Sequence, residues 1–193
     1  MEQPRILAFA GSLRQDSYNK RLLKIAANGA RAARADVTVI DLRDYPLPVL
    51  NEDDERAHGL PAEARALKKL FMEHHGLLIA SPEYNSSISA ALKNSLDWVS
   101  RAAEPKEPPL SCYVGKTAAL LSASPGALGG LRGLVHLRAI LGNIRVLVLP
   151  EQQSIPKAHE AFTEDGALRD AKLQKAVEEI GGRLAQLIRK LHE

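Results

Sequence analysis

This chain of 193 residues contains a single cysteine, Cys112. One cysteine excludes an internal disulfide and is typical of a reducing compartment, so we expect a cytoplasmic protein. No apolar run approaches the roughly 20 residues that a membrane helix requires. The first residues, 1–5, lack the apolar region of a signal peptide. We therefore expect no association with a membrane.

Several other chemistries are disfavoured because their motifs are missing. No group of His, Cys and Asp residues has the spacing of metal ligands, so we predict no metal site. The adjacent His74 and His75 are more typical of structural or solvent-facing histidines. The Gly-x-Ser-x-Gly motif of α/β-hydrolases is absent. Basic runs with interleaved aromatic residues are also absent, which argues against nucleic acid as a partner.

The net charge of the chain indicates its partners less strongly than the missing motifs do. The chain has 26 Lys and Arg residues against 23 Asp and Glu residues, a formal net charge of +3. These charges are mixed along the expected helices, as on solvated faces. A small basic excess would favour the approach of an anionic substrate or cofactor.

The pattern of apolar runs predicts strands that alternate with helices. Strands are expected at residues 6–10, 37–42, 76–80, 116–123 and 145–149, helices at 19–34, 61–73, 88–100, 131–141 and 166–192, and irregular segments at 43–59 and 102–114. This alternation predicts an α/β fold in one domain, residues 1–193, with a five-stranded parallel sheet covered on both faces. In the common strand order 2-1-3-4-5, ligands bind beyond the carboxyl ends of the strands, between the first and third.

The loop at residues 11–19 follows the first expected strand and precedes a helix. A helix N-terminus offers free N–H groups and partial positive charge to phosphate. Polar side chains in the loop add hydroxyl, amide and guanidinium groups, from Ser12, Arg14, Ser17 and Asn19. We predict phosphate binding here; the alternative is a simple turn in which Ser17 or Asn19 caps the helix.

Two standard phosphate motifs do not apply to this chain. Only Gly11 of a G-x-G-x-x-G dinucleotide fingerprint is present in the first loop. The triplet at residues 115–117 resembles the end of a Walker loop, but Leu110 stands where that loop needs its first glycine. We interpret the triplet as accidental.

Two further loops are expected at the same edge of the sheet. Residues 81–88 include Tyr84 and Asn85, whose aromatic face and amide suit a flat heteroaromatic ligand. The alternative is a turn that caps the next helix. Residues 124–130 contain three glycines that would let the backbone approach a ligand, or that would simply make the connection mobile.

Three motifs together resemble the NADPH-dependent FMN reductase family, which includes flavin, quinone, azo-dye and chromate reductases. They are Gly11-Ser12-Leu13-Arg14 with Ser17 and Asn19, then Pro82-Glu83-Tyr84-Asn85, then Leu92-Lys93-Asn94 with Leu96-Asp97-Trp98. The resemblance covers about residues 5–150. It implies a flavodoxin-like three-layer sandwich, bound FMN, NADPH or NADH as co-substrate, a small-molecule electron acceptor and a homodimer or homotetramer.

The resemblance also assigns roles to residues. Those that would hold the FMN phosphate are Ser12, Arg14, Ser17 and Asn19. Those that would line the isoalloxazine ring are Pro82, Glu83, Tyr84 and Asn85, with Ser124 and Gly126 on its other side. Flavin carries the redox chemistry, so we name no catalytic side chain. We expect Lys93 and Asn94 to serve packing or subunit contacts, and Trp98 to lie in the core or an interface.

One departure from the family and two alternative functions are noted. The family reads S-x-P-G before its L-K-N segment, whereas Ser89-Ala90 stand here in place of the Pro-Gly pair. Serine would cap the helix in their place. The main alternative function is a flavodoxin-type electron carrier that does not oxidise NAD(P)H. Such carriers tend to be acidic, unlike this chain. A degenerate member that acts only as an interaction module is the other alternative.

Overall fold

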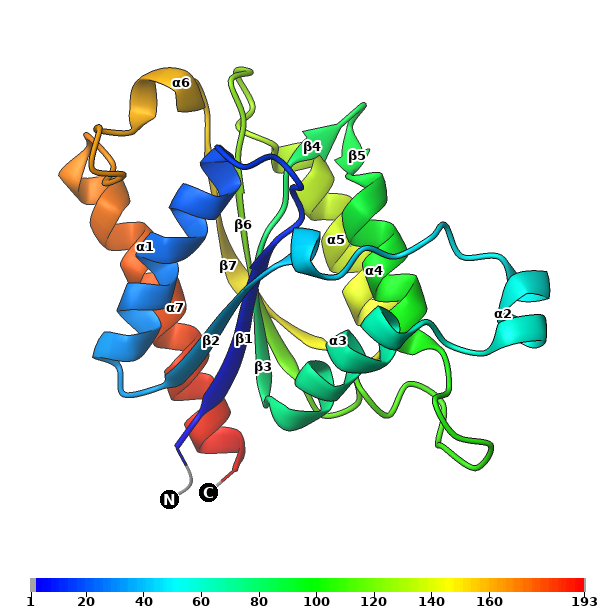
Figure 1. Ribbon diagram of the computed structural model, residues 1–193. Coiled ribbons are helices and arrows are strands. Elements are labelled where there is room, and N and C mark those ends of the chain that lie inside the picture. Colours follow the sequence, from blue (N-terminus) through cyan, green and yellow to red (C-terminus); the bar gives the residue numbers. More distant parts are fainter. Residues whose placement is uncertain (1–2, 193) are drawn as a thin grey trace.

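The computed structural model describes residues 3–192, which are arranged around a five-stranded parallel sheet in the order β2-β1-β3-β6-β7 (Figure 1). The strands are β1 (Arg5–Ala10), β2 (Asp36–Asp41), β3 (Gly76–Ala80), β6 (Thr117–Ala123) and β7 (Leu147–Ile155). In terms of these main-sheet strands the order is 2-1-3-4-5, as expected. The first and third strands are therefore neighbours, and the connections reverse direction between them.

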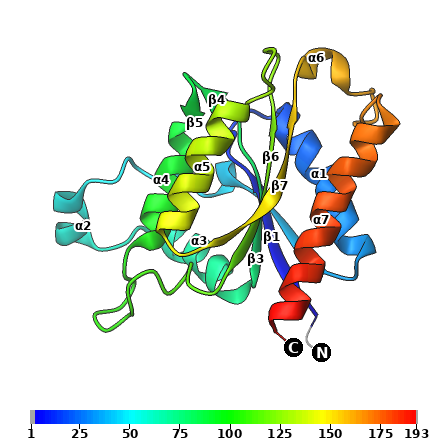
Figure 2. The ribbon, with the colours of Figure 1, turned by 180° about the vertical axis from the view of Figure 1, so that it is seen from behind.

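Helices cover both faces of the sheet and complete three layers. One face carries α1 (Tyr18–Ala32) and α7 (Ala171–Leu191), and the other carries α3 (Ala62–Glu73), α4 (Ala90–Ser100) and α5 (Leu131–Asn143) (Figures 1 and 2). The central strands are buried on both faces, because alternate side chains enter opposite cores. In β1, Ala8 packs on the α1–α7 side and Phe9 on the side of Phe71 and Leu92. The expected fold class is confirmed.

Glycine allows α1 and α7 to pack closely. A Cβ atom added to Gly29 would lie 1.9 Å from the Glu178 backbone oxygen, and one added to Gly181 would lie 1.9 Å from the Ala26 oxygen. No side chain fits at either position without separating the helices. The apolar stripe of α7 that the sequence indicated, including Val177, is buried against this surface.

The structure differs from expectation in the segments that lack a clear apolar period. The expected irregular segment 43–59 contains a 3-10 turn, η1 (Leu42–Asp44), and a helix, α2 (Glu52–His58). None of the α2 residues is buried, so no apolar stripe marks it in the sequence. Its start depends instead on Asn51, whose side chain accepts a hydrogen bond from the Asp53 N–H at 3.0 Å.

The last part of the chain also has different boundaries. The fifth strand continues through Pro150 to Ile155, because β7 is an edge strand with a register shift opposite Ala118 and Leu120. Edge strands and bulges tolerate proline. A short helix, α6 (Ala158–Ala161), follows. The last helix begins at Ala171 rather than 166, because Asp170 caps it.

A small second sheet replaces part of the expected loop after β3. Its strands, β4 (Glu83–Tyr84) and β5 (Ser87–Ile88), form an antiparallel hairpin, so α4 begins at Ala90 rather than Ile88. Across the described residues, no helix has the length and apolar character needed to cross a membrane. Within residues 3–192, no group of His, Cys, Asp and Glu side chains is arranged to hold a metal ion.

Candidate functional site

Three loops meet at the carboxyl edge of the sheet, which is the upper edge in Figure 1. They follow β1, β3 and β6. Hydrogen bonds between neighbouring strand ends hold them in register: the Gly11 N–H donates to the Ala80 oxygen at 2.9 Å, and the Ser81 N–H to the Leu121 oxygen at 2.8 Å. The loops predicted to bind one ligand therefore start side by side.

The loop between β1 and α1 has polar side chains with few hydrogen bonds to the rest of residues 3–192. Ser17 occupies the N-cap position of α1, yet its side chain makes no capping hydrogen bond. The Ser12 hydroxyl accepts only a long bond, 3.3 Å, from the Arg14 N–H. Within residues 3–192 the Arg14 guanidinium makes no ion pair, and its side chain is exposed. Helix-capping by Ser17 or Asn19 side chains, the simple alternative, is not observed.

Gly11 lets this loop pass close to α4. A Cβ atom at position 11 would lie 2.9 Å from the Leu92 side chain. Ser89 also joins this loop to α4. Its hydroxyl donates to the Gly11 oxygen at 2.5 Å and accepts from the Leu92 N–H at 3.1 Å. Ser89 thus caps α4, as expected for the serine that stands in place of Pro-Gly, and it also fixes the start of the loop.

The Asn19 side chain bonds to the end of β6, in addition to the phosphate role predicted for it. Its side chain is 3% exposed and bonds to the backbone of Ala123 at both ends, each at 2.9 Å. These bonds use the amide oxygen and one of the two Nδ2 hydrogens, which leaves the second N–H of the amide for a ligand. The backbone N–H of Asn19 lies in the first turn of α1, where N–H groups have no partner within the helix. Asn19 therefore links the start of α1 to the end of β6.

The second loop presents an aromatic side chain on a tight turn. Asn85 and Ser86 have φ values of 50° and 67°, the left-handed pair that a two-residue hairpin needs, and Asn tolerates this conformation well. Tyr84 precedes them and is 53% exposed. Pro82 is buried at the base of the hairpin. The turn thus holds an open phenol ring at the edge of the sheet.

Glu83, which was predicted to line the ring site, turns its carboxylate away toward α5. It accepts bonds from the Arg132 side chain at 2.5 and 2.9 Å and from the Gly133 N–H at 3.2 Å. Burial alone would raise the pKa of Glu83, but the hydrogen bonds from Arg132 and Gly133 outweigh it and lower the pKa. The Glu83 carboxylate is therefore held against the start of α5.

The third loop is held by the end of β7. The Ser124 N–H donates to the Ile155 oxygen at 3.1 Å, and the Ser124 oxygen accepts from the Ala158 N–H at 3.0 Å. A Cβ atom at Gly129 would lie 2.6 Å from the Ile155 backbone, so packing requires this glycine. Gly126 is exposed and has no such restriction. The loop is tied to β7 rather than left as an unanchored connection.

In the Leu-Lys-Asn segment of α4, Asn94 makes a packing contact, as expected, and its partner is a loop that the sequence did not indicate. The Asn94 side chain accepts from the Leu50 N–H at 2.9 Å and donates to the Pro48 oxygen at 2.8 Å. The Trp98 Nε1 donates to the same oxygen at 2.7 Å, and Trp98 is buried as expected. These bonds fix one wall of a groove of about 490 Å³ beside Leu13 of the first loop.

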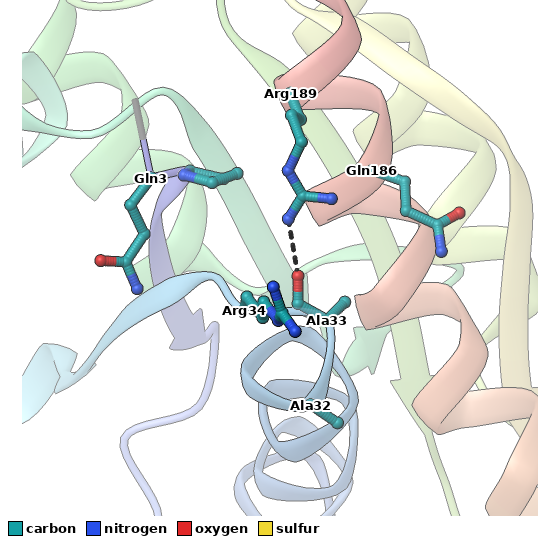
Figure 3. Close-up of a pocket in the computed structure, with 7 residues that line it drawn as sticks. Gln3, Ala32, Ala33, Arg34, Gln186 and Arg189 are labelled. Carbon is teal, nitrogen blue, oxygen red and sulfur yellow. Dashed lines mark hydrogen bonds between the residues drawn. The ribbon is translucent and has the colours of Figure 1, made fainter. Parts of the chain in front are cut away.

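A second groove, of about 680 Å³, lies at the opposite end of the sheet (Figure 3). Gln3 and Pro4 line it before β1, and Arg189 of α7 crosses it to donate to the Ala33 oxygen at 2.8 Å. None of the three loops reaches it. Ligands of open parallel sheets bind beyond the carboxyl ends, so we do not assign the site here.

Comparison with known proteins identifies relatives of this chain. The family model of NADPH-dependent FMN reductases matches residues 4–160. A probable NADPH:quinone oxidoreductase of Oryza sativa subsp. japonica is 35% identical over 180 residues, which span 91% of this chain and 84% of that protein. An NAD(P)H-dependent FMN reductase of Pseudomonas aeruginosa is 34% identical over 176 residues, 91% of this chain and 90% of that protein.

A solved structure shows the same fold over nearly the whole length. FerB, a flavoenzyme NAD(P)H:(acceptor) oxidoreductase from Paracoccus denitrificans, has a TM-score of 0.78 at 27% identity, covering 97% of this chain and 98% of that one. The family match, the curated relatives and the three-loop edge lead to one conclusion. This chain belongs to the NADPH-dependent FMN reductase family.

Proposed function

We propose that this protein holds FMN at the three loops and transfers reducing equivalents from NAD(P)H to a small acceptor such as a quinone, free flavin, an azo compound or a metal oxyanion. The observation that carries the proposal is the set of polar side chains between β1 and α1 that the fold leaves available for a ligand. Ser17 occupies an N-cap without capping, and Arg14 has no ion pair within residues 3–192. A phosphate monoester would satisfy these groups.

The residues present fit FMN at both of its ends. The Ser12 and Ser17 hydroxyls, the Arg14 guanidinium and the first N–H groups of α1 would hold the phosphate. The exposed Tyr84 and the backbone of the hairpin would meet the ring on one side. Ser124 and Gly126 would approach from the other, since Gly126 leaves space for close contact. The Asn19 side chain links the first loop to Ala123, next to the third loop, through two hydrogen bonds.

When bound, FMN supplies the redox chemistry, because it accepts hydride from NAD(P)H and returns electrons to an acceptor. The chain's own residues bind, orient and leave one face of the ring open. We propose that donor and acceptor use that same open face in turn, which predicts ping-pong kinetics. Backbone N–H groups near the ring would favour the anionic reduced form.

An electron carrier without its own NAD(P)H oxidation is the second candidate. The same donor set would serve it, but the net charge of +3 is opposite to the acidic surface typical of such carriers. The names of the rice and Pseudomonas relatives also favour a reductase. We further propose a cytoplasmic homodimer or homotetramer, which light scattering of the purified protein would test.

The deciding experiment is a visible spectrum of the purified protein with added FMN, recorded before and after anaerobic addition of NADPH. A reductase should bleach rapidly and recover its absorbance when a quinone is added. Bound flavin that stays oxidised would favour the carrier. A protein that binds no flavin would contradict the assignment of the loop between β1 and α1.

A further inference from the structure

The hairpin that carries Tyr84 is attached to α5 rather than to the main sheet. Its strands β4 and β5 pair only with each other among the described strands. Two residues of the hairpin bond to α5 side chains: Glu83 to Arg132 at 2.5 and 2.9 Å, and Ser87 to His136, whose Nδ1 lies 2.9 Å from the hydroxyl oxygen. Helix α5 therefore determines the position of the turn that joins β4 and β5.

At Gly133, the surface of α5 allows close contact with the β4–β5 hairpin. A Cβ atom at Gly133 would lie 3.2 Å from the Ser87 oxygen and 3.4 Å from the Glu83 Cβ, so a larger residue would push the hairpin outward. The Gly133 N–H also donates to Glu83 at 3.2 Å. The Glu83 side chain is 8% exposed, whereas that of Arg132 is 57% exposed. The carboxylate is thus the fixed element, and Arg132 covers it from outside.

We propose that Arg132 is a positioning residue that acts through Glu83 to hold the Tyr84–Asn85 turn in the place where it can contact the flavin ring. The inference rests on the proposed function, because the ring site is assigned to this hairpin. Arg132 itself need not touch the ligand. Its bond to Glu83 spans 49 residues of sequence, so one ion pair connects the hairpin to the first turn of α5.

Two explanations of an Arg132 effect must be separated. In the first, the ion pair fixes the position of the hairpin. In the second, the guanidinium charge acts through space on an anionic ligand. Arg132→Met removes one positive charge, whereas Glu83→Gln removes one negative charge. Loss of position predicts the same direction of change in both variants, and a charge effect predicts opposite directions.

The test measures FMN affinity by fluorescence titration and amide hydrogen exchange of residues 82–88 in the protein without flavin. Positioning predicts that both single variants raise the Kd for FMN, roughly five- to tenfold for a partly exposed charged bond, and that both speed exchange in the hairpin. The charge-neutral double variant should then resemble either single variant. A double variant that returns to wild-type affinity would establish the charge effect and overturn the proposal.

Arg138 on the same helix supplies the control. Its side chain bonds to the Leu149 and Pro150 oxygens and to Gln152, all in β7, and not to the hairpin. Arg138→Met should leave hairpin exchange and FMN affinity unchanged. If Arg138→Met speeds hairpin exchange and raises the Kd for FMN as much as Arg132→Met does, the effect comes from a general loosening of α5, and the proposal is wrong.

If Arg132→Met impairs folding, the milder substitution Arg132→Lys can be tested in its place. Lysine retains the charge but loses the second donor, so we expect an intermediate Kd and intermediate exchange. Wild-type exchange in this variant together with wild-type affinity in Arg132→Met would overturn the proposal. Hairpin exchange needs no flavin, so failure of FMN binding in the wild-type protein would contradict the proposed function alone.

Discussion

The Asn19 side chain and the Ala123 backbone exchange two hydrogen bonds, each 2.9 Å long, across 104 residues of sequence. The amide Nδ2 donates to the Ala123 oxygen, and Oδ1 accepts from its N–H. Asn19 stands in the first turn of α1, and Ala123 is the last residue of β6. One side chain therefore joins the loop proposed for phosphate to the loop proposed for the ring.

Asn19→Ala should destabilise the protein and weaken its flavin site together. The change removes two buried hydrogen bonds and leaves both Ala123 groups unpaired, which we expect to cost about 2–3 kcal/mol of unfolding free energy. Urea denaturation without flavin measures this loss. Asn28→Ala, on an exposed position of α1, should change stability by less than about 0.5 kcal/mol. Equal losses in the two variants would contradict the role of the Asn19–Ala123 bonds.

Arg14→Ala should weaken FMN binding without affecting the fold. The Arg14 side chain is exposed and has no ion pair within residues 3–192, so its loss removes only ligand contacts. We expect a penalty of about 1.5–3 kcal/mol in FMN affinity, as for a charged hydrogen bond. Isothermal titration with FMN measures it. Lys24→Ala changes net charge equally on an exposed site of α1 and should leave affinity unchanged. The same FMN affinity in the Arg14 variant and wild type would refute the phosphate assignment.

Neighbouring glycines of α7 should respond oppositely to alanine. Gly181→Ala places a Cβ 1.9 Å from the Ala26 oxygen, so the helices must separate, at a cost of at least about 2 kcal/mol. At Gly182 the nearest atom is 3.7 Å away, so alanine fits there. Its better helix propensity should add up to about 1 kcal/mol. Thermal unfolding of both variants measures the difference, and similar melting temperatures would show that α1 and α7 are not in this close contact.

A buried ion pair should make stability depend on pH in the acid range. The Lys68 Nζ lies 2.6 Å from the Glu107 carboxylate, and both side chains are largely buried. Burial alone would raise the pKa of Glu107, but hydrogen bonds from Lys68, Ser111 and the Ala103 N–H lower it from 4.5 to about 2. The stabilisation is therefore complete above pH 4.5 and is lost as the pH falls toward 2.

Glu107→Gln tests this dependence. At pH 7 the variant should be less stable than wild type by about 3 kcal/mol, which is the free energy that corresponds to such a pKa shift. At pH 3 the difference should shrink by more than half. Denaturant unfolding at the two pH values measures both. Glu104→Gln, at a side chain 77% exposed, should show little change at either pH. A Glu107 difference that is independent of pH would exclude the ionised carboxylate as its cause.

Asn94→Ala should release the loop that it anchors. The Leu50 N–H loses its acceptor and the Pro48 oxygen loses one of two donors, so hydrogen exchange across residues 45–51 should speed up. We expect a stability loss of about 1–2 kcal/mol. Lys93→Ala breaks only an exposed ion pair with Asp97 and should cost less than about 0.5 kcal/mol. Unchanged exchange at 45–51 in the Asn94 variant would show that Trp98 alone holds the loop.

Local pattern was sufficient for the elements that build the core. The apolar strands around Phe9, the stripe of α7 that includes Val177 and the Ser89 cap are all apparent in short windows of sequence, because burial and capping act between near neighbours. Helix α2 was missed because nothing in it is buried, and the end of β7 was missed because Pro150 normally ends a strand that is not at an edge.

The sequence by itself determined the fold class and the loops at the carboxyl ends of the strands, since alternating strands and helices permit few arrangements. The strand order agrees with the common order 2-1-3-4-5. Only the tertiary structure decided what each polar side chain in those loops does. Asn19 and Glu83 have the residue types of ligand contacts, yet their partners are Ala123 and Arg132. A hydrogen bond across 104 or 49 residues leaves no local pattern, because it forms only after the sheet has brought the loops together.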